Sequence, residues 1–157
     1  MLNHMKYAII IFFAGAMIGI SGCGISGEEV GRVEINQLYN SDNMQLHSTE
    51  VQLFPGDELT IWSDMNLEYN GEPMIRGIVQ VLDGNEIVFG QEFDPRISGI
   101  TVSEKKVTLN NHTSWSFLKK NAVFEPQKDG MYTIKCFFMA PTDNGVKVNK
   151  AHIVLKK

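Results

Sequence analysis

The sequence has few cysteines and no cluster of basic residues. Its 157 residues include two cysteines, which are too few for a disulfide framework. There are 14 Lys and Arg against 18 Asp and Glu, giving a formal net charge of −4. Because the basic residues are scattered, nucleic acid is not an expected partner. The HxH, HExxH and CxxC spacings of zinc sites are absent, and the histidines are isolated, so no metal is expected.

The first 22 residues contain no Asp or Glu, and their only basic residue is Lys6. An uncharged stretch, YAIIIFFAGAMIGI, follows at 7–20. The apolar core of a signal peptide has about 7–15 residues, whereas a membrane-spanning helix needs roughly 20. The length of this stretch is therefore typical of a signal peptide and short for a permanent membrane helix.

The apolar stretch ends in Ile20-Ser21-Gly22-Cys23, an aliphatic residue followed by two small residues and a cysteine. This motif resembles the lipobox of bacterial lipoproteins. The resemblance implies that residues 1–22 are a cleaved signal peptide and that Cys23 carries a diacylglycerol thioether. It also implies a further acyl chain, such as palmitate, on the new amino terminus, and several acyl chains anchor a protein stably. The alternatives are a chance cysteine after an ordinary signal peptide or a lone membrane helix.

The same resemblance implies where the protein is located. Gly24, rather than Asp, follows Cys23, and in Gram-negative lipoproteins this means that no inner-membrane retention signal is present. We therefore expect a cell-envelope protein anchored in a membrane through its lipid. The membrane would be the outer membrane in a Gram-negative organism and the plasma membrane in an organism with one membrane. The covalent lipid on Cys23 is the only attached group expected, with no other cofactor.

Alanine is scarce beyond Cys23. This part of the chain has three alanines against 29 Val, Ile and Thr, and helices favour alanine whereas strands favour β-branched residues. The composition therefore predicts an all-β domain. The glycine-containing segment 23–31 is predicted to be a lipidated flexible tether, and 32–157 a single antiparallel β-sandwich.

Alternating apolar residues and turn signals predict about seven or eight strands at spacings of roughly 10–15 residues, which is typical of a β-sandwich. Asp83-Gly84 between two apolar runs predicts a hairpin. A second hairpin is expected at the C-terminus, around a turn at 141–145. The candidate strands are 32–38, 50–54, 58–65, 74–82, 86–93, 130–140 and 146–155, and weaker patterns occur at 106–109 and 113–117.

The segment Asp129-Gly130-Met131-Tyr132 resembles the start of strand F in immunoglobulin-like domains. In that family the tyrosine hydroxyl forms a hydrogen bond back across the corner, and a cysteine follows two residues later. Here Ile134 occupies the cysteine position. The resemblance implies an Ig-like sandwich without the disulfide, and it implies nothing specific about function.

No residue stands out as catalytic. Cys136 is the only thiol that remains once Cys23 is lipidated, and alternation places it with Ile134 and Phe138 on the face that we expect to be buried. A catalytic thiol needs exposure and an adjacent base, so Cys136 is predicted to be a small core residue. We therefore expect no enzymatic activity.

Aromatic side chains are the candidate binding residues. Within 58–65, Trp62 lies on the face opposite the apolar one, so we expect it to point outward beside polar residues, where Tyr69 and Trp115 could join it. An exposed Trp suits stacking on a carbohydrate or contact with a protein. The alternative is that the N-terminal segment or the loop at 94–106 covers Trp62.

Phe137 and Met139 raise a similar question, because alternation places them opposite the core face, where they are too apolar for open solvent. Either another segment covers them or a partner does. The sequence thus predicts a lipid-anchored cell-envelope protein with a non-catalytic binding or scaffolding domain, whose partner is an envelope protein or a glycan. One alternative is a glycan-binding module that uses Trp62 and Tyr69 as stacking platforms. Another is a small hydrolase or inhibitor whose site is assembled across strands.

Overall fold

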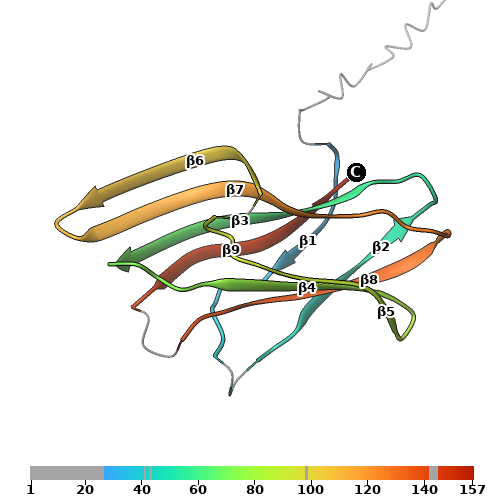
Figure 1. The fold of residues 1–157 in the computed structure, drawn as a ribbon, viewed down its shortest axis with the longest axis horizontal. Helices are drawn as coiled ribbons and strands as arrows, with labels where there is room; N and C mark the ends of the chain where they lie inside the picture. The colour runs from blue at the N-terminus through green and yellow to red at the C-terminus, as the bar shows by residue number, and fades with distance from the viewer. Residues whose placement is uncertain (1–26, 41, 43, 98, 142–144) are drawn as a thin grey trace, which may run out of the picture.

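The computed structural model describes residues 27–40, 42, 44–97, 99–141 and 145–157, which form nine strands in two antiparallel sheets (Figure 1). The strands are β1 (Glu29–Glu34), β2 (His47–Leu53), β3 (Leu59–Asn70), β4 (Arg76–Asp83), β5 (Glu86–Phe93), β6 (Ile100–Leu109), β7 (His112–Phe124), β8 (Gly130–Met139) and β9 (Lys147–Lys156). The predicted all-β sandwich is confirmed, with nine strands in place of seven or eight. No helix in the described ranges has the length and apolarity needed to cross a membrane.

One sheet has five strands in the order β1–β9–β3–β7–β6, and the other has four in the order β2–β8–β4–β5. Alternate side chains of both sheets fill the space between them. The largest fully buried side chains include Phe138, Leu53, Leu59, Ile61, Met65, Leu67, Ile75 and Ile134. Burial of these apolar surfaces holds the two sheets face to face.

Two tight turns connect neighbouring strands. In the β4–β5 hairpin, Asp83 lies opposite Glu86, and Gly84 has a φ of 60°, which glycine adopts without steric cost. This confirms the hairpin predicted from Asp83-Gly84. In the β6–β7 hairpin, Asn110 and Asn111 have φ values of 49° and 66°, a pair of left-handed residues that suits the twist of a two-residue hairpin.

The predicted C-terminal hairpin is wrong. Strand β8 pairs with β2 and β4, whereas β9 pairs with β1 and β3 in the other sheet. The two strands are each flanked by partners that are distant in the sequence, and a local turn signal contains no information about such partners. The structure also moves the domain boundary, because β1 begins at Glu29, inside the segment 23–31 that was predicted to be a tether.

The hydrogen bond expected at the corner before β8 is present, since the Tyr132 hydroxyl donates to the Lys128 carbonyl over 2.9 Å. Tyr132 is buried against Phe124 with ring centroids 5.5 Å apart, so its aromatic body is in the core while its polar end is satisfied. The predicted signal peptide at 1–22 and the lipid-attachment residue Cys23 lie outside the described residues.

Candidate functional site

The β6–β7 hairpin forms one edge of the five-stranded sheet. Figure 1 shows it extending past the end of the four-stranded sheet, so that the outer half of the hairpin has no strand of the second sheet beneath it. Strand β6 is the last of its sheet, and among the described strands it pairs only with β7. All ten of its residues are exposed. One complete edge of the five-stranded sheet therefore has backbone groups without a strand partner.

Four apolar side chains of β6 are exposed to solvent. Ile100 and Leu109, at the two ends of the strand, are 65% and 71% exposed, and Val102 and Val107 are about half exposed. Opposite them on β7 are side chains on the outer face of the sheet, such as Lys120 beside Ile100 and His112 beside Leu109. An edge strand with this much exposed apolar surface is a candidate for contact with another protein.

A groove of about 360 Å³ lies under the inner face of the hairpin. Its lining residues are Tyr69, Glu72, Pro73, Arg96, Ile97, Glu104, Lys106 and Trp115. The Trp115 indole N–H donates to Glu104 Oε1 over 2.7 Å. The ammonium groups of Lys106 and Lys119 lie 4.6 and 4.9 Å from the Trp115 ring centroid, which is cation–π distance. These contacts leave Trp115 only 5% exposed.

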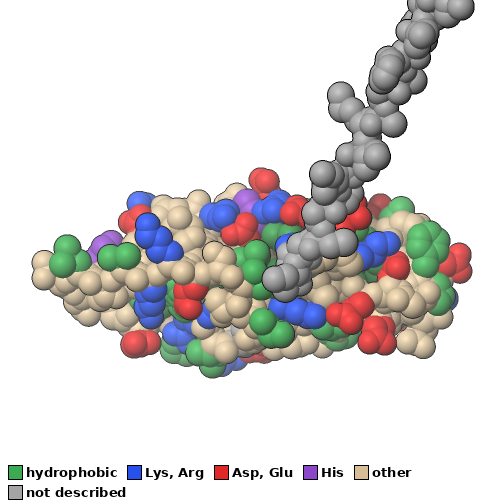
Figure 2. Space-filling view, turned by 90° about the horizontal axis from the view of Figure 1, so that it is seen from above, with side chains coloured by type: hydrophobic (Ala, Val, Ile, Leu, Met, Phe, Trp, Pro, Cys, Tyr) green, Lys and Arg blue, Asp and Glu red, His purple; other side chains and the backbone are tan. Residues whose placement is uncertain are grey.

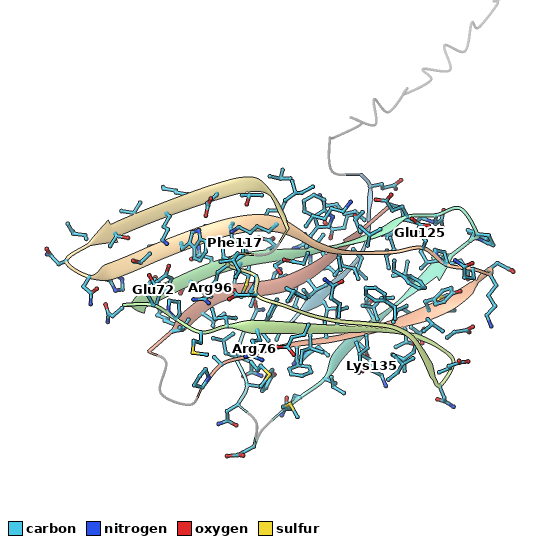
Figure 3. All side chains as sticks on the ribbon, in the orientation of Figure 1. Glu72, Arg76, Arg96, Phe117, Glu125 and Lys135 are labelled. Atoms are coloured by element: carbon cyan, nitrogen blue, oxygen red, sulfur yellow. The ribbon has the colours of Figure 1, made fainter. Side chains whose placement is uncertain are left out.

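Arg96 joins the loops beneath the hairpin. Its guanidinium pairs with Asp94 at 2.6 Å and donates to the Pro73 carbonyl, while its own carbonyl accepts a 2.5 Å hydrogen bond from the buried Lys119 ammonium. Figure 3 shows Arg96 and Glu72 below Phe117. Burial opposes the charged form of Asp94, but the hydrogen bonds from Arg96 outweigh it and lower the pKa of this carboxyl.

Sequence patterns did not indicate this groove. Glu72 and Arg96 come from loops with no local motif, and Glu104 and Lys106 lie on a strand whose full length was not predicted. The available signals were the Asn110-Asn111 turn and Trp115, which follows it. Glu72 and Glu104 place two carboxylates in one groove, and the hydrolase or inhibitor interpretation remains a prediction that these contacts do not test.

The prediction that Trp62 is exposed is wrong, since only 4% of its surface is accessible. Its indole N–H donates to Thr60 Oγ1 over 2.8 Å, and the Lys156 ammonium lies 5.1 Å from its ring centroid. Trp62 does lie outside the core cluster, as alternation predicted, beside a hollow of about 430 Å³ that Ile100 and Val102 also line. The Lys156 side chain thus lies over the apolar surface of Trp62.

Tyr69 does not join Trp62. It continues the inward-facing row of β3, is 4% exposed, and packs edge-on against Trp115 with ring centroids 6.4 Å apart. The predicted strand ended at residue 65, whereas β3 extends to Asn70, so alternation turns the Tyr69 ring into the core. The structure therefore has no exposed pair of Trp62 and Tyr69 on one surface.

Phe137 and Met139 are covered by another segment of the chain. Phe137 is 7% exposed and belongs to the core cluster, against which Met139 packs. Tyr39, in the connection between β1 and β2, lies beside the end of β8. There the Tyr39 amide donates to the Phe138 carbonyl over 2.9 Å, and the Ala140 amide donates to the Tyr39 carbonyl over 2.8 Å. Phe137 and Met139 are therefore not a free binding surface. Of the two predicted explanations, coverage by another segment of the chain holds.

Cys136 is a buried core residue, as predicted. It is 1% exposed, and burial raises the pKa of its thiol to about 12, so the reactive thiolate is not populated at neutral pH. In the ranges that the structure describes, no three His, Cys, Asp or Glu side chains are grouped so as to hold a metal ion.

A network of charged side chains crosses the outer face of the five-stranded sheet. Arg32 pairs with Glu29 at 2.8 Å and Asp64 at 3.3 Å, and lies 3.0 Å from His152 Nδ1. Figure 2 shows side chains of both signs interspersed over the surface seen from above. Partial burial, together with the neighbouring Arg32 charge, lowers the pKa of His152 below its ordinary value of 6.5.

This lowered pKa predicts a pH-dependent stability. Below pH 6.5 the unfolded chain binds a proton at His152 more readily than the folded chain, so the free energy of unfolding should fall as the pH falls toward the lower, folded-state pKa. Urea unfolding of the wild type and His152→Asn between about pH 7.5 and 5.5 measures the effect. His152→Asn should show a smaller dependence of the free energy of unfolding on pH than the wild type. An identical dependence in both proteins would contradict the assignment of this effect to His152.

Comparison of the chain with protein-family models, with curated protein sequences and with solved structures finds no match.

Proposed function

We propose that this chain is a lipid-anchored cell-envelope protein whose non-catalytic β-sandwich binds a protein partner along the open edge of β6. The observation that carries the proposal is the exposure of all ten β6 residues on an edge that pairs only with β7. Such an edge offers backbone hydrogen bonds for affinity and alternate side chains for specificity, which is how many domains bind an added strand.

The aromatic side chains favour a protein over a glycan as the ligand. Stacking on a sugar requires a free ring face, and Trp62, Tyr69 and Trp115 are each 5% exposed or less. Two ammonium groups already lie within cation–π distance of the Trp115 ring. Ile100, Val107 and Leu109 of β6, in contrast, are each more than half exposed.

The attachment point of the tether is compatible with this use of β6. The Glu28 amide donates to the Lys157 carbonyl over 2.8 Å, and the Lys157 amide donates to the Glu28 carbonyl over 2.9 Å, so the chain joins the domain beside β1. Strand β1 is the first strand of the five-stranded sheet, and β6 is the last. Gly27, at the start of the described chain, lines the same hollow as Ile100 and Val102. A lipid at Cys23 would therefore hold the domain near the start of β6, and the outer half of the β6–β7 hairpin extends away from that point (Figure 1).

Two matched substitutions test the binding edge. Val107 on β6 and Ile87 on β5 are 54% and 55% exposed, so replacing either with Glu removes a similar exposed apolar group. After cross-linking in the native envelope, Val107→Glu should recover at least about tenfold less cross-linked protein than the wild type, because a charge in a packed contact costs more than 1.4 kcal/mol. Ile87→Glu should recover the wild-type amount. Equal recovery with both variants would contradict binding along β6.

A further inference from the structure

We infer that the partner of β6 is β6 of a second copy of this chain, paired antiparallel about a two-fold axis at Lys105. The two five-stranded sheets would then continue into one another. This inference rests on the proposed function, since it uses the same open edge. What supports it is that β6 is complementary to itself when its residues are assigned to the two faces of the sheet.

A β-bulge sets these faces. Thr101 lies opposite Lys119 of β7, and Ser103 lies opposite the next β7 residue, Leu118, so Val102 is an extra residue in the ladder. On β7 the side chains of Thr113, Trp115, Phe117 and Lys119 are buried. The β6 residues opposite them therefore face inward, and these are Thr101, Glu104, Lys106 and Thr108. The ladder residues that face outward are Ile100, Ser103, Lys105, Val107 and Leu109.

Antiparallel pairing about a two-fold axis places residues of the same face opposite each other, and every pair occurs twice. With Lys105 on the axis, the pairs are Glu104 with Lys106, Ser103 with Val107, Thr101 with Thr108, and Ile100 with Leu109. Each pair shares one face. The bulge is essential to this match, because without the extra residue Ile100 and Leu109 would lie on opposite faces.

The paired residues are also chemically matched. Glu104 and Lys106 have opposite charges on the inner face, and Thr101 with Thr108 is a favourable cross-strand pair. On the outer face, Ile100 would cover Leu109, and these are the two most exposed apolar residues of β6.

The two Lys105 side chains at the axis are the unfavourable contact. Lysines and bulges also protect the edge strands of monomers, but protection does not require that the remaining residues match face by face.

A symmetric cross-link tests the pairing. In the full-length protein in membranes, Lys105→Cys should form a disulfide-linked dimer on oxidation with copper phenanthroline, because the two β-carbons would lie about 4.5–5.5 Å apart across the axis. Val107→Cys on the same face is the matched control. Its copies would lie four ladder positions, about 14 Å, apart and should stay monomeric.

A second variant is expected to strengthen the dimer, whereas a nonspecific disturbance of the β6 surface would weaken it. Lys105→Thr removes the like-charge contact at the axis, so the dissociation constant of the dimer in detergent, measured by sedimentation, should fall about two- to fivefold. A weaker dimer would contradict the register.

Absence of the Lys105→Cys dimer, or equal dimer formation by Lys105→Cys and Val107→Cys, would overturn the inference. Cross-linking of Lys105→Cys only to a different protein would also overturn it, while leaving β6 as the proposed binding edge. Equal recovery of cross-linked protein with Val107→Glu and Ile87→Glu would instead contradict the proposed function.

Discussion

Replacing Cys23 with Ala should abolish incorporation of labelled fatty acid into the protein and release it from the membrane fraction. The reason is chemical, because the Ile20-Ser21-Gly22-Cys23 motif resembles a lipobox in which the cysteine sulfur is the atom that receives the diacylglycerol. Without that sulfur there is no thioether, and the acyl chains that anchor the protein, at about 0.8 kcal/mol for each buried methylene, are lost.

Metabolic labelling followed by purification of the protein provides the measurement. Cys136→Ala is the matched control, since it removes the buried thiol and leaves Cys23 in place. This control should incorporate the label as the wild type does. Fractionation must be interpreted together with labelling, because an uncleaved Cys23→Ala protein could stay in the membrane through its apolar stretch. Unchanged labelling of Cys23→Ala would disprove the assignment of the lipid to this residue.

The second large effect is expected at Gly99, immediately before β6. A β-carbon at this position would lie 1.5 Å from the Lys120 carbonyl oxygen, and the φ of Gly99 is +83°, a conformation that side chains rarely adopt. The backbone of β6 or β7 must move to accept Gly99→Ala. We expect a loss of about 3 kcal/mol or more in the free energy of unfolding.

Gly71→Ala separates the two causes. Gly71 has a similar φ of +73°, but a β-carbon there would meet no atom within 4 Å. Gly71→Ala should lose only about 1–2 kcal/mol of the free energy of unfolding, which is the cost of a side chain in this backbone conformation. Urea unfolding of the two variants and the wild type measures both losses. Equal losses at the two glycines would show that β6 and β7 move apart at little cost, and that the start of β6 is not fixed by close packing.

Local patterns predicted most of the strands and one of the two tight turns of this fold. The scarcity of alanine and the many β-branched residues predicted an all-β domain, and Asp83-Gly84 predicted the β4–β5 hairpin, because these signals act over a few residues. Alternation also assigned Trp62 and Cys136 to the correct faces. It could not predict that Lys156, from the last strand, would lie over the Trp62 ring. The burial of an outward-facing side chain depends on such distant contacts.

The pairing of strands that are distant in the sequence could not be predicted from local patterns either. The sequence around β8 and β9 is compatible with a hairpin, and their separation into two sheets depends on β2, β4, β1 and β3. The groove under the β6–β7 hairpin also depends on contacts between segments that are distant in the sequence. Arg96 and Glu72 meet there because two loops converge, and neither loop has a motif. Strand β6 itself was predicted only at 106–109, because charged residues and a bulge interrupt its apolar pattern.

The strand order of the five-stranded sheet determines how mechanical force would pass through an anchored molecule. The tether joins the domain beside β1, and the proposed binding edge is β6, at the opposite side of the same sheet. Tension between a lipid anchor and a partner would therefore pass laterally from β1 through β9, β3 and β7 to β6. The load would fall on the hydrogen-bonded ladders of this sheet, while the four-stranded sheet would lie outside the path of the force.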